Sequence, residues 1–195
     1  MIRSGCMTAA LLAFLTACND REAVNLDETV AVPPADAPAA ASGDMAGGSV
    51  QRALATLQTA QGEAAGSATA IASEAGVTIS LSVEGLPPGQ HGAHVHLAGR
   101  CEAPTFESAG GHWNPTEAQH GLEGPPGQHA GDMPNLTVNA DGRGSLEYRL
   151  QGANFEGLLD ADGSAMMIHA DADDQRTDPS GASGRRIACG VFRTG

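Results

Sequence analysis

The stretch GVTISLSVEGLPPGQHGAHVHL, residues 76–97, contains the two patterns that decide the fold. In its first half every second residue from Val77 to Val83 is apolar, and a Pro-Pro-Gly turn follows. Such alternation is typical of a β-strand with one buried face. In its second half His94 and His96 also alternate, so a strand there would project both imidazoles from the same face.

Short alternating segments continue along the chain from residue 52 onward, separated by turn residues. Six of them are ALATLQTA, GSATAIAS, NLTVNADG, GSLEYRL, SAMMIHA and RRIACGVF. With the two segments in 76–97 they make eight short strands, and no convincing amphipathic helix accompanies them. This pattern predicts an all-β sandwich or barrel. Because only 3% of the residues are aromatic, we expect a mostly aliphatic core.

The N-terminal quarter, residues 1–50, has a different character. Residues 1–17 combine Arg3 with an apolar run too short to span a bilayer, which is typical of a secretory signal. The residues before Cys18 resemble the lipobox of bacterial lipoproteins, so we expect a lipid on Cys18 that anchors the protein to a membrane of the cell envelope. An ordinary export signal that contains a cysteine is the alternative. Residues 18–50 are rich in Pro, Ala and Gly and predict a disordered linker; residues 51–195 suit one domain.

The net charge is strongly acidic, formally −13, and the chain contains no lysine. Such a balance favours solubility and gives no support for a nucleic-acid partner. Of the four cysteines, Cys6 would leave with the signal and Cys18 would carry the lipid. Two cysteines then remain in an exported domain, Cys101 and Cys189, and most simply form one disulfide.

Residues 98–135 contain no credible strand and are rich in Gly, Pro, Asn and His. So long a loop needs an anchor. The Cys101–Cys189 disulfide would be one, tying the loop to the strand that contains IACG. A second would be a zinc ion, because three imidazoles and one carboxylate suit a closed tetrahedral site that also orders its loop. Those four residues are His112, His120, His129 and Asp132.

The segments GAHVHLAG, SAGGHWNP, QHG, QHAGD, MIHADADD and GRRIACGV occur in this order. They resemble the copper,zinc superoxide dismutases of the exported bacterial type, here in lipoprotein form. The resemblance runs through the whole domain and implies a flattened eight-stranded Greek-key barrel with long metal-binding and electrostatic loops. It also implies one copper and one zinc per subunit. The oligomeric state, monomer or homodimer, stays open.

The resemblance assigns a role to each matching residue. The copper ligands would be His94, His96, His112 and His169. The zinc ligands would be His112, His120, His129 and Asp132, so that the His112 ring is shared between the two ions. Asp173 would link His94 to His120, Arg186 would stand beside the open copper position, and Cys101 and Cys189 would be the family disulfide. His91 has no such role, and we interpret it as a surface residue.

The implied activity is the disproportionation of superoxide to dioxygen and hydrogen peroxide by alternation of Cu(II) and Cu(I), with a redox-inert structural zinc. Arg186 would attract the anion, while Arg185, its neighbour on the strand, would face the other way. Lysines cannot line the channel, so Arg176 and Arg100 are the candidate substitutes. We expect turnover to fall as salt is raised.

Two alternatives remain at this point. The first is an envelope protein that stores copper and zinc on the same barrel without dismutase activity. The second is a structural β-sandwich with a disulfide and incidental histidines, which would leave the long loop without an anchor. A shared histidine and an arginine beside the copper favour the enzyme, because storage does not need an anion guide.

Overall fold

A computed structural model describes residues 50–123 and 127–195 of the chain. The expected signal, the lipidated Cys18 and nearly all of the expected linker lie outside these residues. Within the described ranges no helix has the length and apolar character needed to cross a membrane.

Apart from one 3₁₀ turn and one short α-helix, the regular elements of the described chain are all strands. The 3₁₀ turn η1 spans Glu107–Ala109 and the α-helix α1 spans Phe155–Leu158. The strands are β1 (Arg52–Thr59), β2 (Ala64–Ser73), β3 (Gly76–Val83), β4 (Gly89–His91), β5 (Ala93–His96), β6 (Leu136–Val138), β7 (Gly144–Leu150), β8 (Ala165–His169), β9 (Arg186–Val191) and β10 (Arg193–Thr194).

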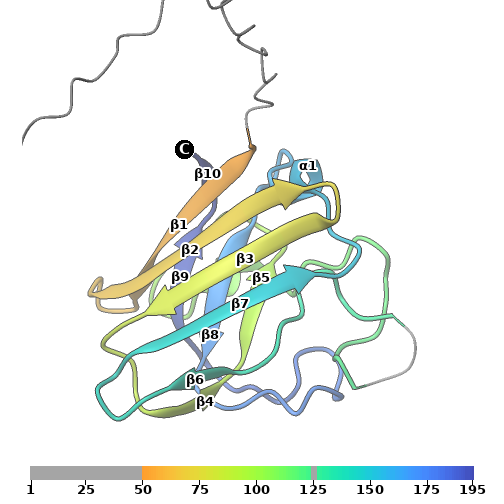
Figure 1. Cartoon of the computed structure of the whole chain (residues 1–195). Coiled ribbons are helices and arrows are strands. Elements are labelled where there is room, and N and C mark those ends of the chain that lie inside the picture. Colours follow the sequence, from red (N-terminus) through yellow and green to blue (C-terminus); the bar gives the residue numbers. More distant parts are fainter. Residues whose placement is uncertain (1–49, 124–126) are drawn as a thin grey trace, which may run out of the picture. The chain divides into compact units, whose positions relative to one another are not determined.

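All strand pairs are antiparallel, and the strands follow one path in the order β4-β6-β7-β3-β2-β1-β9-β8-β5, with β10 paired to β1. Strands β1, β2, β3 and β7 form one layer, and β5, β8 and β9 lie behind it (Figure 1). The two ends of the path, β4 and β5, are separated in sequence by Gly92 alone. One chain segment therefore nearly closes the sheet into a barrel, and the expected all-β fold is confirmed.

Ten strands replace the eight expected because two segments change partners midway. Strand β4 pairs with β6 and β5 pairs with β8, and the change falls at Gly92. There the backbone bonds to the end of β8 and to a residue just beyond it: the Gly92 carbonyl accepts from His169 N–H, and Gly92 N–H donates to the Asp171 carbonyl. The last expected segment ends at Phe192, and beyond it the chain forms a further short strand, β10, which pairs with β1.

The alternating residues do point into the core. The burial of β3 alternates as its sequence predicts, and the other long strands of the front layer behave alike. The core is aliphatic apart from a few aromatic rings, as expected from the composition. Its largest fully buried apolar side chains are Phe192, Leu57, Ile79, Met133, Leu136, Leu150, Leu158, Met166, Met167 and Ile168.

Candidate metal centre

The long loop is held by the outer edge of β5, the last strand of the path. Val95 of β5 accepts a hydrogen bond from Trp113 N–H and donates one to the Gly131 carbonyl, at 2.8 and 2.9 Å. Isolated bridges form on either side of it, pairing His96 with His112 and His94 with Asp132. Strand pairing thus places two loop residues beside the two strand histidines. As predicted, no strand lies between residues 98 and 135 of the described chain.

Gly131 allows this close approach. A Cβ at this position would lie 2.2 Å from the Val95 carbonyl oxygen. The backbones of Gly131 and Val95 are paired and cannot move apart without breaking that pairing. Any other residue would push the loop away from β5, and Asp132 would move with it.

Four buried imidazoles come together at one end of β5. They belong to His94, His96, His112 and His169. Each ring has one nitrogen that lies within 4.8 Å of a nitrogen of each of the other three rings. Backbone carbonyls orient two of them: Nδ1 of His96 lies 2.9 Å from the Gly110 oxygen, and Nδ1 of His169 lies 3.2 Å from the Gly184 oxygen. Their Nε2 atoms therefore point inward and lie 3.4 Å apart. We call this set the four-histidine group.

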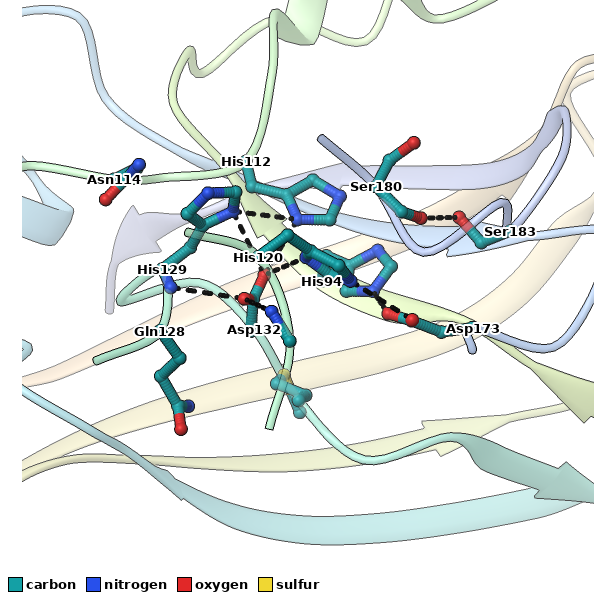
Figure 2. A network of polar contacts seen from close by, with 12 residues as sticks. His94, His112, Asn114, His120, Gln128, His129, Asp132, Asp173, Ser180 and Ser183 are labelled. Carbon is teal, nitrogen blue, oxygen red and sulfur yellow. Dashed lines mark hydrogen bonds and ion pairs between the residues drawn. The ribbon is translucent and has the colours of Figure 1, made fainter. Parts of the chain in front are cut away.

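A second group surrounds the carboxylate of Asp132 (Figure 2). Oδ1 of Asp132 lies 2.8, 3.0 and 3.3 Å from the Nδ1 atoms of His112, His120 and His129. Its other oxygen, Oδ2, accepts the backbone N–H groups of Gly121 and His129 at 2.8 and 3.1 Å. These bonds fix the carboxylate so that Oδ1 faces three imidazole nitrogens. His112 belongs to both groups.

Asp173 connects the two groups through contacts with His94 and His120 (Figure 2). Its Oδ2 lies 2.6 Å from Nε2 of His94 and its Oδ1 lies 3.1 Å from Nε2 of His120. The Asn135 side chain in turn clamps the Asp173 backbone, accepting from its N–H and donating to its carbonyl at 2.8 Å each. A single buried carboxylate thus sets the ring orientation of one histidine in each group.

Burial keeps the four-histidine group neutral. It lowers the pKa of His94 to about 3, against the opposing hydrogen bond to Asp173, and that of His169 to about 4. The pKa of His96 is held well below its ordinary value by the same cause. Neutral imidazoles offer a lone pair to an ion, which is the form that metals bind.

The Asp132 group differs at His120 and at its carboxylates. Burial lowers the pKa of His120, but hydrogen bonds to Asp132 and Asp173 outweigh it and raise that pKa to about 9. Burial raises the pKa of each aspartate, yet hydrogen bonds from the histidines hold both pKa values well below the ordinary value. The carboxylates are therefore ionised and suited to a divalent cation.

Both groups fit metal ions. Nδ1 of His94 and Nε2 of His112 are buried and have no hydrogen-bond partner among the described residues, although buried polar groups normally have one. An ion held by the four-histidine group would satisfy both atoms. An all-imidazole set suits copper, and three imidazoles with one carboxylate suit a tetrahedral zinc site.

Asp173→Asn tests the link between the groups. An amide retains one acceptor oxygen and turns an NH₂ toward the second ring, so one of the two hydrogen bonds is lost. We expect the affinity for zinc to fall by about 10- to 100-fold, the usual effect of losing such a partner, with a smaller loss for copper. Chelator competition on the purified protein measures both affinities. Asp174→Asn, at an exposed neighbouring carboxylate, is the control and should leave them unchanged.

Arg186 lies next to the four-histidine group at the start of β9. Its two terminal nitrogens donate to the carbonyls of Phe106 and Gly110, each at 2.5 Å. The Gly110 oxygen is also the one that orients His96. The guanidinium is half-buried and fixed, and its remaining N–H groups are available to an anion.

His91 and Arg176 differ from what the sequence predicted. His91, expected at the surface, is only 3% exposed, and each of its ring nitrogens lies 2.8 Å from a backbone carbonyl oxygen; the interpretation was wrong. Arg176, a candidate for attracting the substrate, forms an exposed ion pair with Glu123 at 2.7 Å, so its charge is largely compensated. Arg100 and Arg185 are exposed.

The predicted disulfide is present. Cys101 and Cys189 are bonded across a separation of 88 residues, with their Cα atoms 5.7 Å apart. It joins the loop before η1 to the middle of β9, the strand that begins with Arg186.

An antiparallel barrel with two adjoining, buried donor groups that share one imidazole defines a metalloprotein with a two-ion centre. The family model described as Copper/zinc superoxide dismutase (SODC) matches residues 61–192. The chain belongs to this family.

Individual relatives agree. A protein named Superoxide dismutase [Cu-Zn] 2 from Aquifex aeolicus is 42% identical over 148 residues, which cover 73% of this chain and 86% of that protein. Superoxide dismutase [Cu-Zn] from Caulobacter vibrioides is 40% identical, covering 72% and 85%. Among solved structures, Cu/Zn superoxide dismutase from Brucella abortus has a TM-score of 0.61 at 28% identity, and a SOD-like protein from Bacillus subtilis has 0.65 at 41%; they cover 73% and 71% of this chain and 99% and 96% of theirs.

Proposed function

We propose that the four-histidine group holds copper and that the Asp132 group holds zinc. The observation that carries this assignment is the position of His112. Its Nδ1 lies at the Asp132 carboxylate, and its buried Nε2 has no hydrogen-bond partner within residues 50–123 and 127–195. The zinc ligands are then His112, His120, His129 and Asp132. The copper ligands are His94, His96, His112 and His169.

The protein is a superoxide dismutase with one copper and one zinc per chain. Copper, when bound, supplies the one-electron chemistry, because alternation between Cu(II) and Cu(I) oxidises one superoxide to dioxygen and reduces a second to hydrogen peroxide. The protein's own residues position the ions, guide the anion and supply protons. Zinc has no redox chemistry and orders the loop that contains His112.

His112 is placed to handle one of the two protons that hydrogen peroxide requires. Its Nε2 faces the four-histidine group and can hold and release a proton at that atom. Its Nδ1 is fixed at the zinc group, which keeps the ring oriented whether or not Nε2 is protonated. Asp132 and the pairing of the loop with β5 hold the ring in place.

Metal analysis together with a dismutase assay tests the assignment. The purified protein, loaded with both metals, should contain one copper and one zinc per chain and should dismutate superoxide. Removal of zinc should change the electron paramagnetic resonance spectrum of the copper, because the two ions share a ring. One ion per chain, or a copper spectrum indifferent to zinc, contradicts the assignment.

Arg186 provides the fixed positive group beside the copper ligands that an anionic substrate needs. We expect Arg186→Ala to lower kcat/KM by about tenfold, the scale of one lost charge-assisted hydrogen bond, with copper content retained. The kcat/KM of Arg186→Lys should lie between those of the wild type and Arg186→Ala. The activity of the wild type should fall as salt is raised, and that dependence should weaken in Arg186→Ala. Equal activity in all three proteins would show that Arg186 does not guide the anion.

We further propose that the mature protein is a lipoprotein of the cell envelope, anchored through Cys18. The lipobox-like residues before Cys18 and the linker composition of 18–50 support this location. Metabolic labelling with a radioactive fatty acid should mark the wild type and leave Cys18→Ser unlabelled. A label that persists in the variant would contradict the anchor at this residue.

A further inference from the structure

His120 differs from the other members of the Asp132 group in how its main chain is held. Isolated bridges to β5 hold the main chains of His112 and Asp132, and His129 N–H donates to the Asp132 carboxylate at 3.1 Å. His120 takes part in neither bridge. Its N–H instead donates to Oδ1 of Asp178 at 2.6 Å, across a separation of 58 residues.

The position of the His120 main chain decides where its ring lies. The ring is buried between two carboxylates (Figure 2). Nδ1 lies 3.0 Å from Oδ1 of Asp132, and Nε2 lies 3.1 Å from Oδ1 of Asp173. Because each nitrogen has its own partner, a rotation of the ring cannot compensate for a shift of the backbone without breaking one of these contacts.

A loop of residues 173–181 packs on the segment 120–123, which begins with this ligand. A Cβ at Gly121 would overlap the Gln175 carbonyl oxygen, so only glycine allows the two backbones to approach so closely here. Glu123 N–H donates to the same oxygen at 3.2 Å. The two segments are therefore in backbone contact beside the ligand.

Backbone hydrogen bonds within this loop fix the place of Asp178. Gly181 N–H donates to the Thr177 carbonyl at 2.7 Å, and the Gly181 carbonyl accepts from Asp174 N–H at 2.9 Å. A Cβ at Gly181 would overlap the Asp173 carboxylate, so the backbone of the loop lies directly against that group. Asp178 follows Thr177 and is thus presented to His120 by a hydrogen-bonded turn.

We infer that Asp178 is a positioning residue for zinc: its carboxylate holds the main chain of His120 so that Nδ1 of this ligand faces Oδ1 of Asp132. The inference depends on the zinc assignment proposed above. The role requires an acceptor oxygen at this place and not a negative charge, because the oxygen accepts from a neutral backbone N–H group. Asp178 itself is exposed and belongs to neither donor group.

Two substitutions of Asp178 separate the acceptor from the charge. Asp178→Ala removes both. Asp178→Asn removes the charge and retains an amide oxygen that can accept from His120 N–H. Glu123→Ala is the matched control, because it also removes an exposed carboxylate between the two segments, the one that pairs with Arg176 at 2.7 Å. Exposed ion pairs contribute little to stability, and the bond to His120 N–H is left intact.

The readouts are the zinc affinity by chelator competition and the visible absorption spectrum of Co(II) bound in place of zinc, which reports the arrangement of the ligands. We expect Asp178→Ala to lower zinc affinity about tenfold and to change the Co(II) spectrum, with copper binding retained. Asp178→Asn should keep most of the wild-type affinity and spectrum. Glu123→Ala should leave both unchanged.

The inference is overturned if Asp178→Ala binds zinc with wild-type affinity and spectrum, if Asp178→Asn loses as much as Asp178→Ala, or if Glu123→Ala loses as much as either. If Asp178→Ala does not fold, Asp178→Ser takes its place under the same criteria, because its hydroxyl is one bond shorter and cannot reach His120 N–H. A wild-type protein that binds no zinc would instead contradict the zinc assignment, because the variants are judged only against the wild type.

Discussion

His112→Ala should lower dismutase activity by about 100-fold or more while most of the zinc and part of the copper remain bound. Loss of a residue that merely orients a ligand usually costs 10- to 100-fold, and His112 is itself in both donor groups. Its removal takes a nitrogen from each ion, the link between them and the proton-holding Nε2. Activity and metal content measured on the same preparation test this result.

Disorder of the loop could also lower activity, so the control must disturb the loop without removing a ligand. Asn114 lies two residues away, and its side chain makes two hydrogen bonds to the backbone of Ala118, each at 2.9 Å. Asn114→Ala removes both and touches neither group. A loss in Asn114→Ala as large as in His112→Ala would show that loop order, and not the shared ring, limits the reaction.

The sequence alone predicted the structural features that rest on a repeated residue pattern or on a concentration of one residue type in one segment. Alternation in the segment from Val77 to Val83 predicted a strand with one buried face, and that strand is present. The loop 98–135 could not be stable without anchors, and this predicted both a disulfide and a cluster of ligands. Side chains of the residues that were expected to bind metals do lie together, because the edge of β5 pairs with the loop.

The features that the sequence did not predict depend on backbone atoms. His91 precedes His94 by three residues, so simple alternation places it on the other face, where it would be exposed. The change of partner at Gly92 turns its ring inward toward the carbonyls of Pro87 and His169. A sequence pattern does not show which backbone carbonyl will face a particular side chain. The Gly110 oxygen, which orients both His96 and Arg186, was unpredictable for the same reason.

Cys101→Ser combined with Cys189→Ser should lower the free energy of unfolding by about 4.6 kcal/mol, the scale expected for a bond that closes a loop of this length. The separation of 88 residues means that the unfolded chain gains much conformational freedom when the bond is absent. Urea unfolding of the metal-free protein measures the change. A reducing agent should destabilise the wild type to the same extent and leave the double variant unaffected.

The same change should affect catalysis through Arg186. The disulfide fixes the loop before η1 to β9, and the carbonyls of Phe106 and Gly110, the residues on either side of η1, hold the guanidinium. Without the disulfide, η1 and the loop before it can move relative to β9. Arg186 then loses its fixed orientation beside His96. We expect kcat/KM of the metal-loaded double variant to fall toward that of Arg186→Ala at temperatures where it is fully folded. Adding Arg186→Ala to the double variant should then have little further effect, whereas a full tenfold additional loss would show that the disulfide stabilises the fold without positioning the arginine.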